Sequence, residues 1–163
     1  MLIAVIFMSV MLAFGVVLGS IAYKQEVLAS SAIDSQYAFY AGDAGLECAL
    51  FEDQQYATGQ SLFAYDSNPN DPVPTFSCNA TAPYTTPTRT LSGSGTAALQ
   101  VLSYEFALDS DSCVYIDVYK YQYPQPPANL TTYIFSQGFS ASCATVAAPG
   151  KTRFSSRGIQ AHY

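Results

Sequence analysis

The first 23 residues of the chain contain no charged side chain and read MLIAVIFMSVMLAFGVVLGSIAY. In a helix that rises about 1.5 Å per residue, this run matches the roughly 30 Å hydrocarbon thickness of a bilayer. A secretory signal peptide would have basic residues before the apolar run and a small-residue cleavage site after it. This run has neither, so we expect Met1 to be a processed N-terminus from which a short basic leader was removed.

The helical pattern continues beyond the apolar run. From Lys24 to Asp53 there is no proline, and apolar residues recur at three- and four-residue spacing, which places them on one helix face. These residues are Ile33, Tyr37, Tyr40, Ala44, Cys48 and Phe51. We expect one helix over residues 1–53, with a hydrophobic assembly or membrane segment at 1–23 and an amphipathic part at 24–53. The first half would need burial in lipid or against copies of itself.

Two glycines interrupt the apolar run with the spacing GVVLG, at Gly15 and Gly19. A GxxxG spacing permits close helix–helix contact in a membrane, although small residues are also simply tolerated there. Each glycine weakens a helix by about 1 kcal/mol relative to alanine. The same pair therefore also marks a candidate helix break.

The chain has four cysteines, and they are compatible with three disulfide connectivities. None lies in a CxxC motif, and the single histidine is His162, so a zinc site would have almost no ligands. We therefore expect disulfides, no metal and no cofactor. Disulfides would place the cysteine-bearing part of the chain in an oxidising compartment.

Beyond Asp53 the composition changes. Residues 54–96 are rich in Ser, Thr, Pro, Asn and Gly, which predicts a long variable loop. Residues 97–163 alternate between polar and apolar side chains, which predicts an antiparallel sheet with strands near residues 102–108, 114–118, 131–140 and 152–163. Residues 54–163 would then form one disulfide-stapled globular head.

The disulfide pairing follows from the connection between the second and third expected strands. This connection reads YPQPPAN, which a helix would not accommodate. A hairpin folded about residue 128 places Cys113 opposite Cys143, which favours Cys113–Cys143 and leaves Cys48 to pair with Cys78. Each disulfide would close a loop of about 30 residues and stabilise the head by ~3–4 kcal/mol.

Charge and motif content exclude two broad functions. The net charge is −6 with only six Lys and Arg, whereas nucleic-acid binding needs clustered basic residues. The chain also lacks a Gly-rich phosphate loop, a GxSxG motif and a Cys–His pair with a suitable context. We therefore expect neither nucleic-acid binding nor catalysis, and no catalytic residue.

Three local patterns have two interpretations each. DSNPND at residues 66–71 begins like a calcium-binding EF-hand loop, but Asp71 replaces the glycine and Ser77 the bidentate glutamate, so a turn is favoured. Asn79-Ala-Thr and Asn129-Leu-Thr are glycosylation sequons or simply solvated loops.

Several tyrosines, some of them at every second position, also have two interpretations. They pack on a loop or neighbour and cover a sheet face, or they form a surface that binds sugars or other ligands. These tyrosines are Tyr115, Tyr119, Tyr121, Tyr123 and Tyr133.

The apolar N-terminal run, followed at the right distance by AFYAGDAGLECAL at residues 38–50, resembles the type IV pilin superfamily, including minor pilins and pseudopilins. The resemblance covers about the first 53 residues. It implies an α+β pilin fold, in which the C-terminal half of a long helix packs on a small antiparallel sheet. It also implies a leader removed by a prepilin peptidase, and a membrane-held pool of subunits.

The resemblance further implies a helical homopolymer at the cell surface or in an extracellular filament, used for adhesion, motility or uptake. Its partners would be other copies of the chain, other pilins and an inner-membrane assembly platform. The expected assembly interface consists of apolar residues of the first segment: Met1, Leu2, Ile3, Val5, Ile6, Phe7, Val10, Leu12, Ala13, Phe14, Val17, Leu18 and Ile21.

One residue departs from the pilin pattern. If Met1 begins the mature chain, Val5 stands where most pilins have a glutamate that neutralises the terminal amine of a neighbouring subunit. The Met1 amine would then need another acceptor, such as Ser9 or a backbone carbonyl. This departure resembles tip-located minor pseudopilins. The alternatives are therefore a minor pilin or pseudopilin that primes or caps a filament, and a monomeric membrane-anchored binding module.

Overall fold

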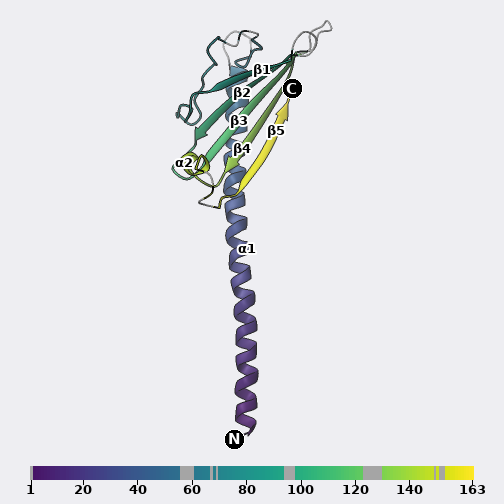
Figure 1. Ribbon diagram of the computed structural model, residues 1–163, viewed down its shortest axis with the longest axis vertical. Coiled ribbons are helices and arrows are strands. Elements are labelled where there is room, and N and C mark those ends of the chain that lie inside the picture. Colours follow the sequence, from purple (N-terminus) through teal and green to yellow (C-terminus); the bar gives the residue numbers. More distant parts are fainter. Residues whose placement is uncertain are drawn as a thin grey trace. The chain divides into compact units, whose positions relative to one another are not determined.

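The computed structural model describes residues 2–55, 61–66, 68, 70–93, 98–122, 130–148, 150 and 153–163. Its elements follow one another as α1 (Leu2–Gln55), β1 (Thr88–Ser92), β2 (Ala98–Ala107), β3 (Cys113–Gln122), β4 (Leu130–Phe139), α2 (Cys143–Val146) and β5 (Ser156–His162) (Figure 1). Met1–Asp34 and Ser35–Tyr163 form two compact units, which are described separately. The second unit is called the head.

The N-terminal unit is the first part of α1, a helix of 54 residues. The helix continues through Gly15 and Gly19, and a Cβ atom added at either glycine would meet nothing within 4 Å. In this single chain the two glycines therefore do not break the helix. A break in an assembled filament stays a prediction.

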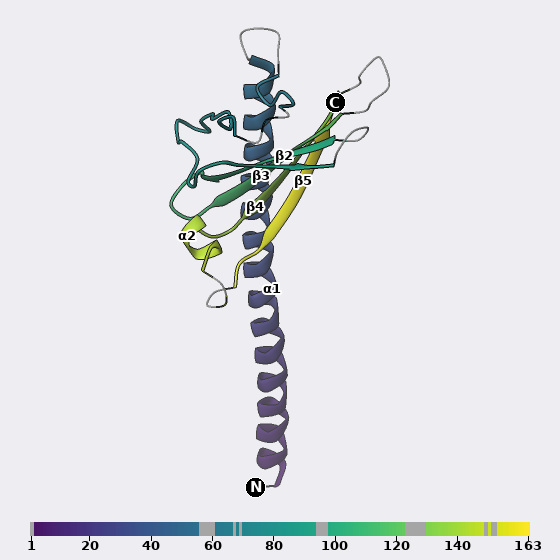
Figure 2. The same cartoon turned by 45° about the horizontal axis from the view of Figure 1, so that its top comes forward.

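In the head, the end of α1 packs on one face of the sheet (Figure 2). Most of its buried residues there have small side chains. The buried positions recur every three or four residues, so they form one stripe along the helix. They are Ala38, Ala41, Gly42, Gly45, Leu46 and Ala49.

The face that shares the apolar spacing of the sequence lies beside this stripe, and Cys48 is its residue that packs against the core. Tyr37, Tyr40 and Phe51 are 60–66% exposed. α1 therefore has two apolar faces in the head, and the apolar spacing by itself does not show which of them meets the sheet. The stripe of small side chains faces the sheet, because only small side chains let the backbones of α1 and β4 approach closely.

Gly138 of β4 marks this close approach. A Cβ atom at Gly138 would lie 2.2 Å from the carbonyl oxygen of Ala38 and 2.2 Å from the nitrogen of Gly42. Next to it, the Ser136 hydroxyl donates a 2.7 Å hydrogen bond to the carbonyl oxygen of Gly42. The helix backbone therefore lies directly on β4, where only glycine fits.

The sheet has five antiparallel strands in the order β1-β2-β3-β4-β5, so each strand pairs with its neighbour in sequence. The expected α+β fold with an antiparallel sheet is confirmed. One strand was missed, because β1 lies in the segment expected to be a loop. Its sequence TRTLS lacks apolar alternation, and its partner β2 supplies the pairing that makes it a strand.

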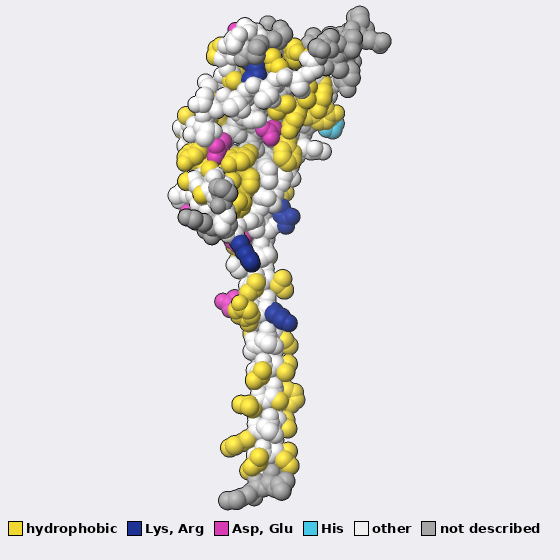
Figure 3. All heavy atoms as spheres, viewed as in Figure 1, with side chains coloured by type: hydrophobic (Ala, Val, Ile, Leu, Met, Phe, Trp, Pro, Cys, Tyr) yellow, Lys and Arg dark blue, Asp and Glu magenta, His cyan; other side chains and the backbone are white. Residues whose placement is uncertain are grey.

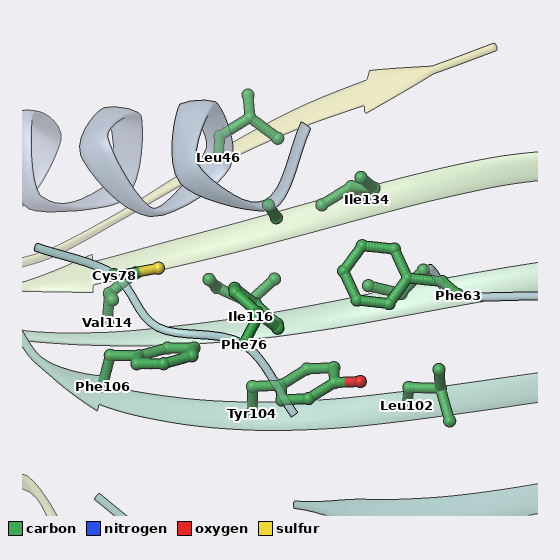
Figure 4. Close-up of a cluster of buried hydrophobic side chains, with 12 residues drawn as sticks. Leu46, Phe63, Phe76, Cys78, Leu102, Tyr104, Phe106, Val114, Ile116 and Ile134 are labelled. Carbon is green, nitrogen blue, oxygen red and sulfur yellow. The ribbon is translucent and has the colours of Figure 1, made fainter. Parts of the chain in front are cut away.

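The segment between α1 and β1 also contributes to the core, although a variable loop was expected there. Phe63 and Phe76 from this segment are buried between α1 and the inner face of the sheet (Figure 4). The ring of Phe76 lies 4.8 Å from the ring of Tyr104 and 4.9 Å from that of Phe106, centroid to centroid. The loop therefore closes the core.

Two disulfides join the four cysteines as Cys48–Cys78 and Cys113–Cys143, the pairs favoured by the sequence. The route to the second pair differs from the expected one. Cys113 lies opposite Phe139 in the β3–β4 register, which centres the hairpin near residue 126 instead of 128. Cys143 reaches Cys113 because the chain turns into α2 directly after β4.

Candidate functional site

The N-terminal segment presents apolar side chains around its whole circumference. Its large apolar residues from Ile3 to Ile21 are between 47% and 84% exposed, and Figure 3 shows hydrophobic side chains along the helix. Those of the predicted assembly interface are Ile3, Val5, Ile6, Phe7, Val10, Leu12, Phe14, Val17, Leu18 and Ile21. Ala13 is exposed as well, whereas the side chains of Met1 and Leu2 lie outside the described residues.

The two serines of this segment do not give it a polar face. Ser9 donates its hydroxyl to the carbonyl oxygen of Ile6, and Ser20 donates to that of Val17, each over 2.8 Å. Their hydroxyl hydrogens are thus bonded within the helix, as polar groups in an apolar surrounding require. The segment is therefore built to be surrounded by apolar groups on every side.

Water is a poor environment for such a surface. Burying apolar area stabilises by about 25 cal/mol per Å², and monomeric soluble proteins rarely expose a large contiguous apolar patch. By length and composition, α1 is also apolar enough to cross a membrane. The segment can therefore be satisfied by lipid or by apolar helices of other chains.

A buried polar network ties the end of α1 to the head. Asp53 is only 6% exposed, and its Oδ1 accepts hydrogen bonds from the Ser61 hydroxyl at 2.5 Å and the Phe63 backbone N–H at 3.1 Å. The other oxygen, Oδ2, accepts from the Tyr163 hydroxyl. Asp53 therefore holds the helix end, the following loop and the edge of the sheet together.

Lys120 of β3 completes this network from the sheet side. It is 1% exposed, and its Nζ donates to Ser61 Oγ over 2.8 Å and to Thr132 Oγ1 over 2.7 Å. Ser61 thus accepts from the lysine and donates to the carboxylate of Asp53. The lysine charge is buried, but it has hydrogen-bond acceptors and an acidic group in the same network.

The charges in the network influence each other. Burial by itself would raise the pKa of Asp53, but hydrogen bonds from Ser61, Tyr163 and Phe63, together with the Lys120 charge, lower it below its usual value. Burial lowers the pKa of Lys120, and the negative charge of Asp53 opposes this. Burial and the hydrogen bond to Asp53 raise the pKa of Tyr163, which keeps its hydroxyl a donor.

This network was not predicted from the sequence, although the position of Lys120 in its strand gave one indication of it. Lys120 has the same strand parity as Val114, Ile116 and Val118, so it lies on the buried face of β3. A lysine at an inward position needs buried partners. Those partners, Asp53 and Ser61, are far away in sequence, so the alternation of β3 does not identify them.

In the DSNPND segment, the described residues Asp66, Asn68 and Asp71 are bonded to one another and to Arg89 of β1. Asp66 Oδ2 makes a 2.8 Å ion pair with Arg89 Nη1, and Asp66 Oδ1 accepts a 2.9 Å hydrogen bond from the Asn68 backbone. Asp71 Oδ1 accepts a 2.7 Å hydrogen bond from the Asn68 side chain. The structure therefore shows these carboxylates engaged within the protein.

Of the two sequons, the structure describes one asparagine. Asn79 is exposed in a tight turn with φ of 52°, directly after the disulfide-bonded Cys78. Asn129 lies outside the described residues. Both interpretations of the sequons, glycosylation and a solvated loop, therefore stay open.

One group of potential metal ligands lies together within the described ranges, at Glu105, Cys113 and Cys143. The two sulfur atoms of this group are joined in a disulfide, so they are not free to bind a metal.

The tyrosines of β3 and β4 lie on the sheet face opposite α1. Tyr121 and Tyr133 are 36% and 40% exposed, with ring centroids 5.7 Å apart. Tyr115 and Tyr119 have the same strand parity as Tyr121, so they lie on the same face. Tyr123 lies outside the described residues.

Comparison with known proteins identifies no relative. No protein-family model matches the chain, and no match was found among curated proteins or among solved structures. What the fold itself defines is a pilin-like architecture: a long helix with an apolar N-terminal part, and an antiparallel sheet contacted by the later part. The apolar helix together with two disulfides indicates a secreted or membrane-associated protein.

Proposed function

We propose that this chain is a structural subunit of an extracellular type IV pilus-like filament, in which it polymerises through its hydrophobic N-terminal helix. The observation that carries this proposal is the apolar surface of the segment from Ile3 to Ile21, which is exposed on all sides. A segment that only crossed a membrane would need the same surface, but the resemblance of residues 38–50 to pilins favours polymerisation. The disulfides suit a head outside the cell.

In this proposal the membrane holds the subunit before assembly, and an inner-membrane platform adds it to the growing filament. Other copies of the chain and other pilins then replace lipid around the helix. Contacts between heads contribute less to assembly than contacts between helices, because the head has few charges and exposes less apolar surface than the N-terminal segment. The filament would serve adhesion, motility or uptake, and no enzymatic activity is proposed.

A minor pilin or pseudopilin is the second candidate, and Val5 favours it. Most major pilins have a glutamate at this position if Met1 begins the mature chain, whereas Val5 is apolar and 66% exposed. Such a subunit would prime or cap the filament without forming its bulk. A monomeric membrane-anchored binding module is the third candidate, favoured by the tyrosines on the outer face of the sheet.

Charge substitution in the helix tests polymerisation. Ala13→Lys and Ile21→Asp should each abolish fibres while the disulfide-bonded head stays folded, since an unpaired charge in an apolar core costs several kcal/mol. Ser156→Asp, at an exposed head position, is the matched control and should leave fibres intact. Fibres that persist with a charge at both helix positions would show that the helix is not the assembly core.

Immunogold electron microscopy of surface material distinguishes the three candidates. Continuous labelling along fibres supports a major subunit, and labelling confined to fibre ends supports a minor subunit. Membrane labelling without fibres supports the anchored binding module and contradicts the filament proposal.

A further inference from the structure

The face of the sheet turned away from α1 has an unusual distribution of charge. Lys120 points to the opposite face, where it is buried, and Arg157 Nε donates to Ser35 Oγ of α1 over 2.7 Å. Arg89 of β1 pairs with Leu102, a core residue, and is held by Asp66. Among the described strand residues, the outer face therefore has the carboxylates Glu105 and Asp117 but no lysine or arginine.

A groove of about 390 Å³ runs over this outer face. It is lined by the chain before and at the start of β1, by β2 and by β3. The side chains used below are Thr85, Thr88, Ser103, Glu105, Tyr115 and Asp117. Its volume lies within the ~300–1,000 Å³ typical of small-molecule sites.

The groove combines three kinds of group. Thr85, Thr88 and Ser103 offer hydroxyls, which both donate and accept hydrogen bonds. Glu105 and Asp117 offer carboxylate oxygens, which accept. Tyr115 offers a ring, and burial with the nearby charge of Glu105 raises the pKa of its hydroxyl, so that the phenol stays neutral.

These groups favour a neutral, hydroxyl-rich ligand. An anionic ligand would face two carboxylates, and no lysine or arginine of the described strands lies on this face to offset their charge. A purely apolar ligand would leave the hydroxyls and carboxylates without hydrogen-bond partners, which disfavours its binding. Glu105 Oε2 already accepts a 2.9 Å hydrogen bond from the Thr85 hydroxyl, which is the kind of contact that a sugar hydroxyl would make with these carboxylates.

Tyrosines continue the surface along β3 beyond the groove. Tyr115, Asp117, Tyr119 and Tyr121 alternate on the outer face, and at about 3.4 Å per residue they span roughly 20 Å. Tyrosine supplies a large amphipathic contact area at low cost in conformational entropy. A row of such rings fits a linear ligand of several similar units, each with an apolar face and polar edges.

We propose that this groove and the tyrosine row bind a neutral oligosaccharide. The ring of Tyr115 packs against the C–H face of one sugar unit, and Asp117 and Glu105 accept hydrogen bonds from sugar hydroxyls. Tyr119 and Tyr121 contact the following units. The inference concerns the head and does not depend on polymerisation, so it applies equally to each candidate in the previous section.

The test is binding of the full chain, in a detergent without a sugar head group, to an array of neutral hexose and N-acetylhexosamine oligosaccharides. Tyr115→Ala and Asp117→Asn should each weaken binding at least tenfold. Tyr115→Phe should retain most binding because it keeps the ring, and it serves as a check since Tyr115 also packs on Phe139 with centroids 4.9 Å apart. Gln54→Ala, at an exposed position on α1 and away from this face, is the matched control.

The length of the oligosaccharide provides a second readout. Tyr121→Ala should weaken binding of hexasaccharides more than binding of disaccharides, which a general loss of folding would not do. The proposal is overturned if no neutral sugar on the array binds, or if Tyr115→Ala and Asp117→Asn both bind like the unmodified chain. Binding of acidic sugars alone also overturns it, as does concentration-dependent dimerisation through this face without sugar binding.

Discussion

Tyr163 donates its phenolic hydrogen to the carboxylate of Asp53, a residue 110 positions earlier in the chain. The backbones of Tyr163 and Thr132 also exchange two hydrogen bonds, of 3.0 and 3.1 Å. The last described residue is therefore held both to the sheet and to the end of α1. The carboxylate of Asp53, in turn, accepts three hydrogen bonds, two from the loop after α1 and one from Tyr163.

Removing the carboxylate should destabilise the head strongly. Asp53→Ala leaves the buried Lys120 without its acidic partner and leaves Ser61 and Tyr163 without their acceptor, so we expect a loss of about 3–5 kcal/mol in the free energy of unfolding. Gln54→Ala, next to it and exposed, should change this free energy by less than about 0.5 kcal/mol. Urea unfolding in detergent, followed by near-ultraviolet circular dichroism, measures both. A loss below about 1 kcal/mol for Asp53→Ala would contradict the role assigned to the network.

The same network predicts a dependence of stability on acid. The pKa of Asp53 is lower in the folded head than its ordinary value of 3.8, so the folded state binds this proton less readily than the unfolded chain does. Its contribution is therefore fully present above about pH 5. It is lost as the pH falls below the ordinary value and through the folded one.

The measurement compares the unmodified chain with Asp53→Asn, which does not titrate there. The difference in unfolding free energy between the two should be constant from about pH 5 to 7 and should shrink in more acidic solution. A difference that stays constant down to pH 2.5 would exclude a shifted Asp53.

The contact between α1 and β4 predicts an intolerance to any side chain at Gly138. Gly138→Ala would place a Cβ atom 2.2 Å from two backbone atoms of α1, so the helix or the strand must move. We expect a destabilisation of about 1–3 kcal/mol or more. Gly19→Ala is the control, since its Cβ atom meets nothing within 4 Å, and it should leave head stability unchanged. Equal stability of the two variants would show that the helix does not press on β4.

The disulfide pairs are open to direct chemical mapping. Non-reducing peptide mapping of native protein should yield Cys48–Cys78 and Cys113–Cys143 peptides. Replacing both Cys48 and Cys78 by serine opens a loop with a sequence separation of 30 residues, which should cost about 3–4 kcal/mol of stability. A Cys48–Cys113 peptide, or four free thiols, would rule out this arrangement.

Several features of the protein follow from the sequence alone, because they depend on residues close together in the chain. The uncharged run before Lys24 and the absence of proline up to Asp53 indicate one long helix, and α1 ends at Gln55. Alternation along residues 102–108 and 114–118 indicates strands, and both lie largely within β2 and β3. The disulfide pairs were also predicted, although Cys143 reaches Cys113 from α2 and not from a position opposite it in the hairpin.

Only the tertiary structure decided how these elements meet. The sheet packs on the Ala38 and Gly42 side of α1 and leaves Tyr37 exposed, because Gly138 of β4 lets only a helix face of small side chains approach closely. Lys120 finds its hydrogen-bond acceptors in Ser61 and Thr132. Likewise, β1 is a strand because it pairs with β2. Each of these depends on backbone proximity between residues far apart in the chain. Local periodicity contains no information about which distant backbone comes close, so these contacts had to be seen in the folded protein.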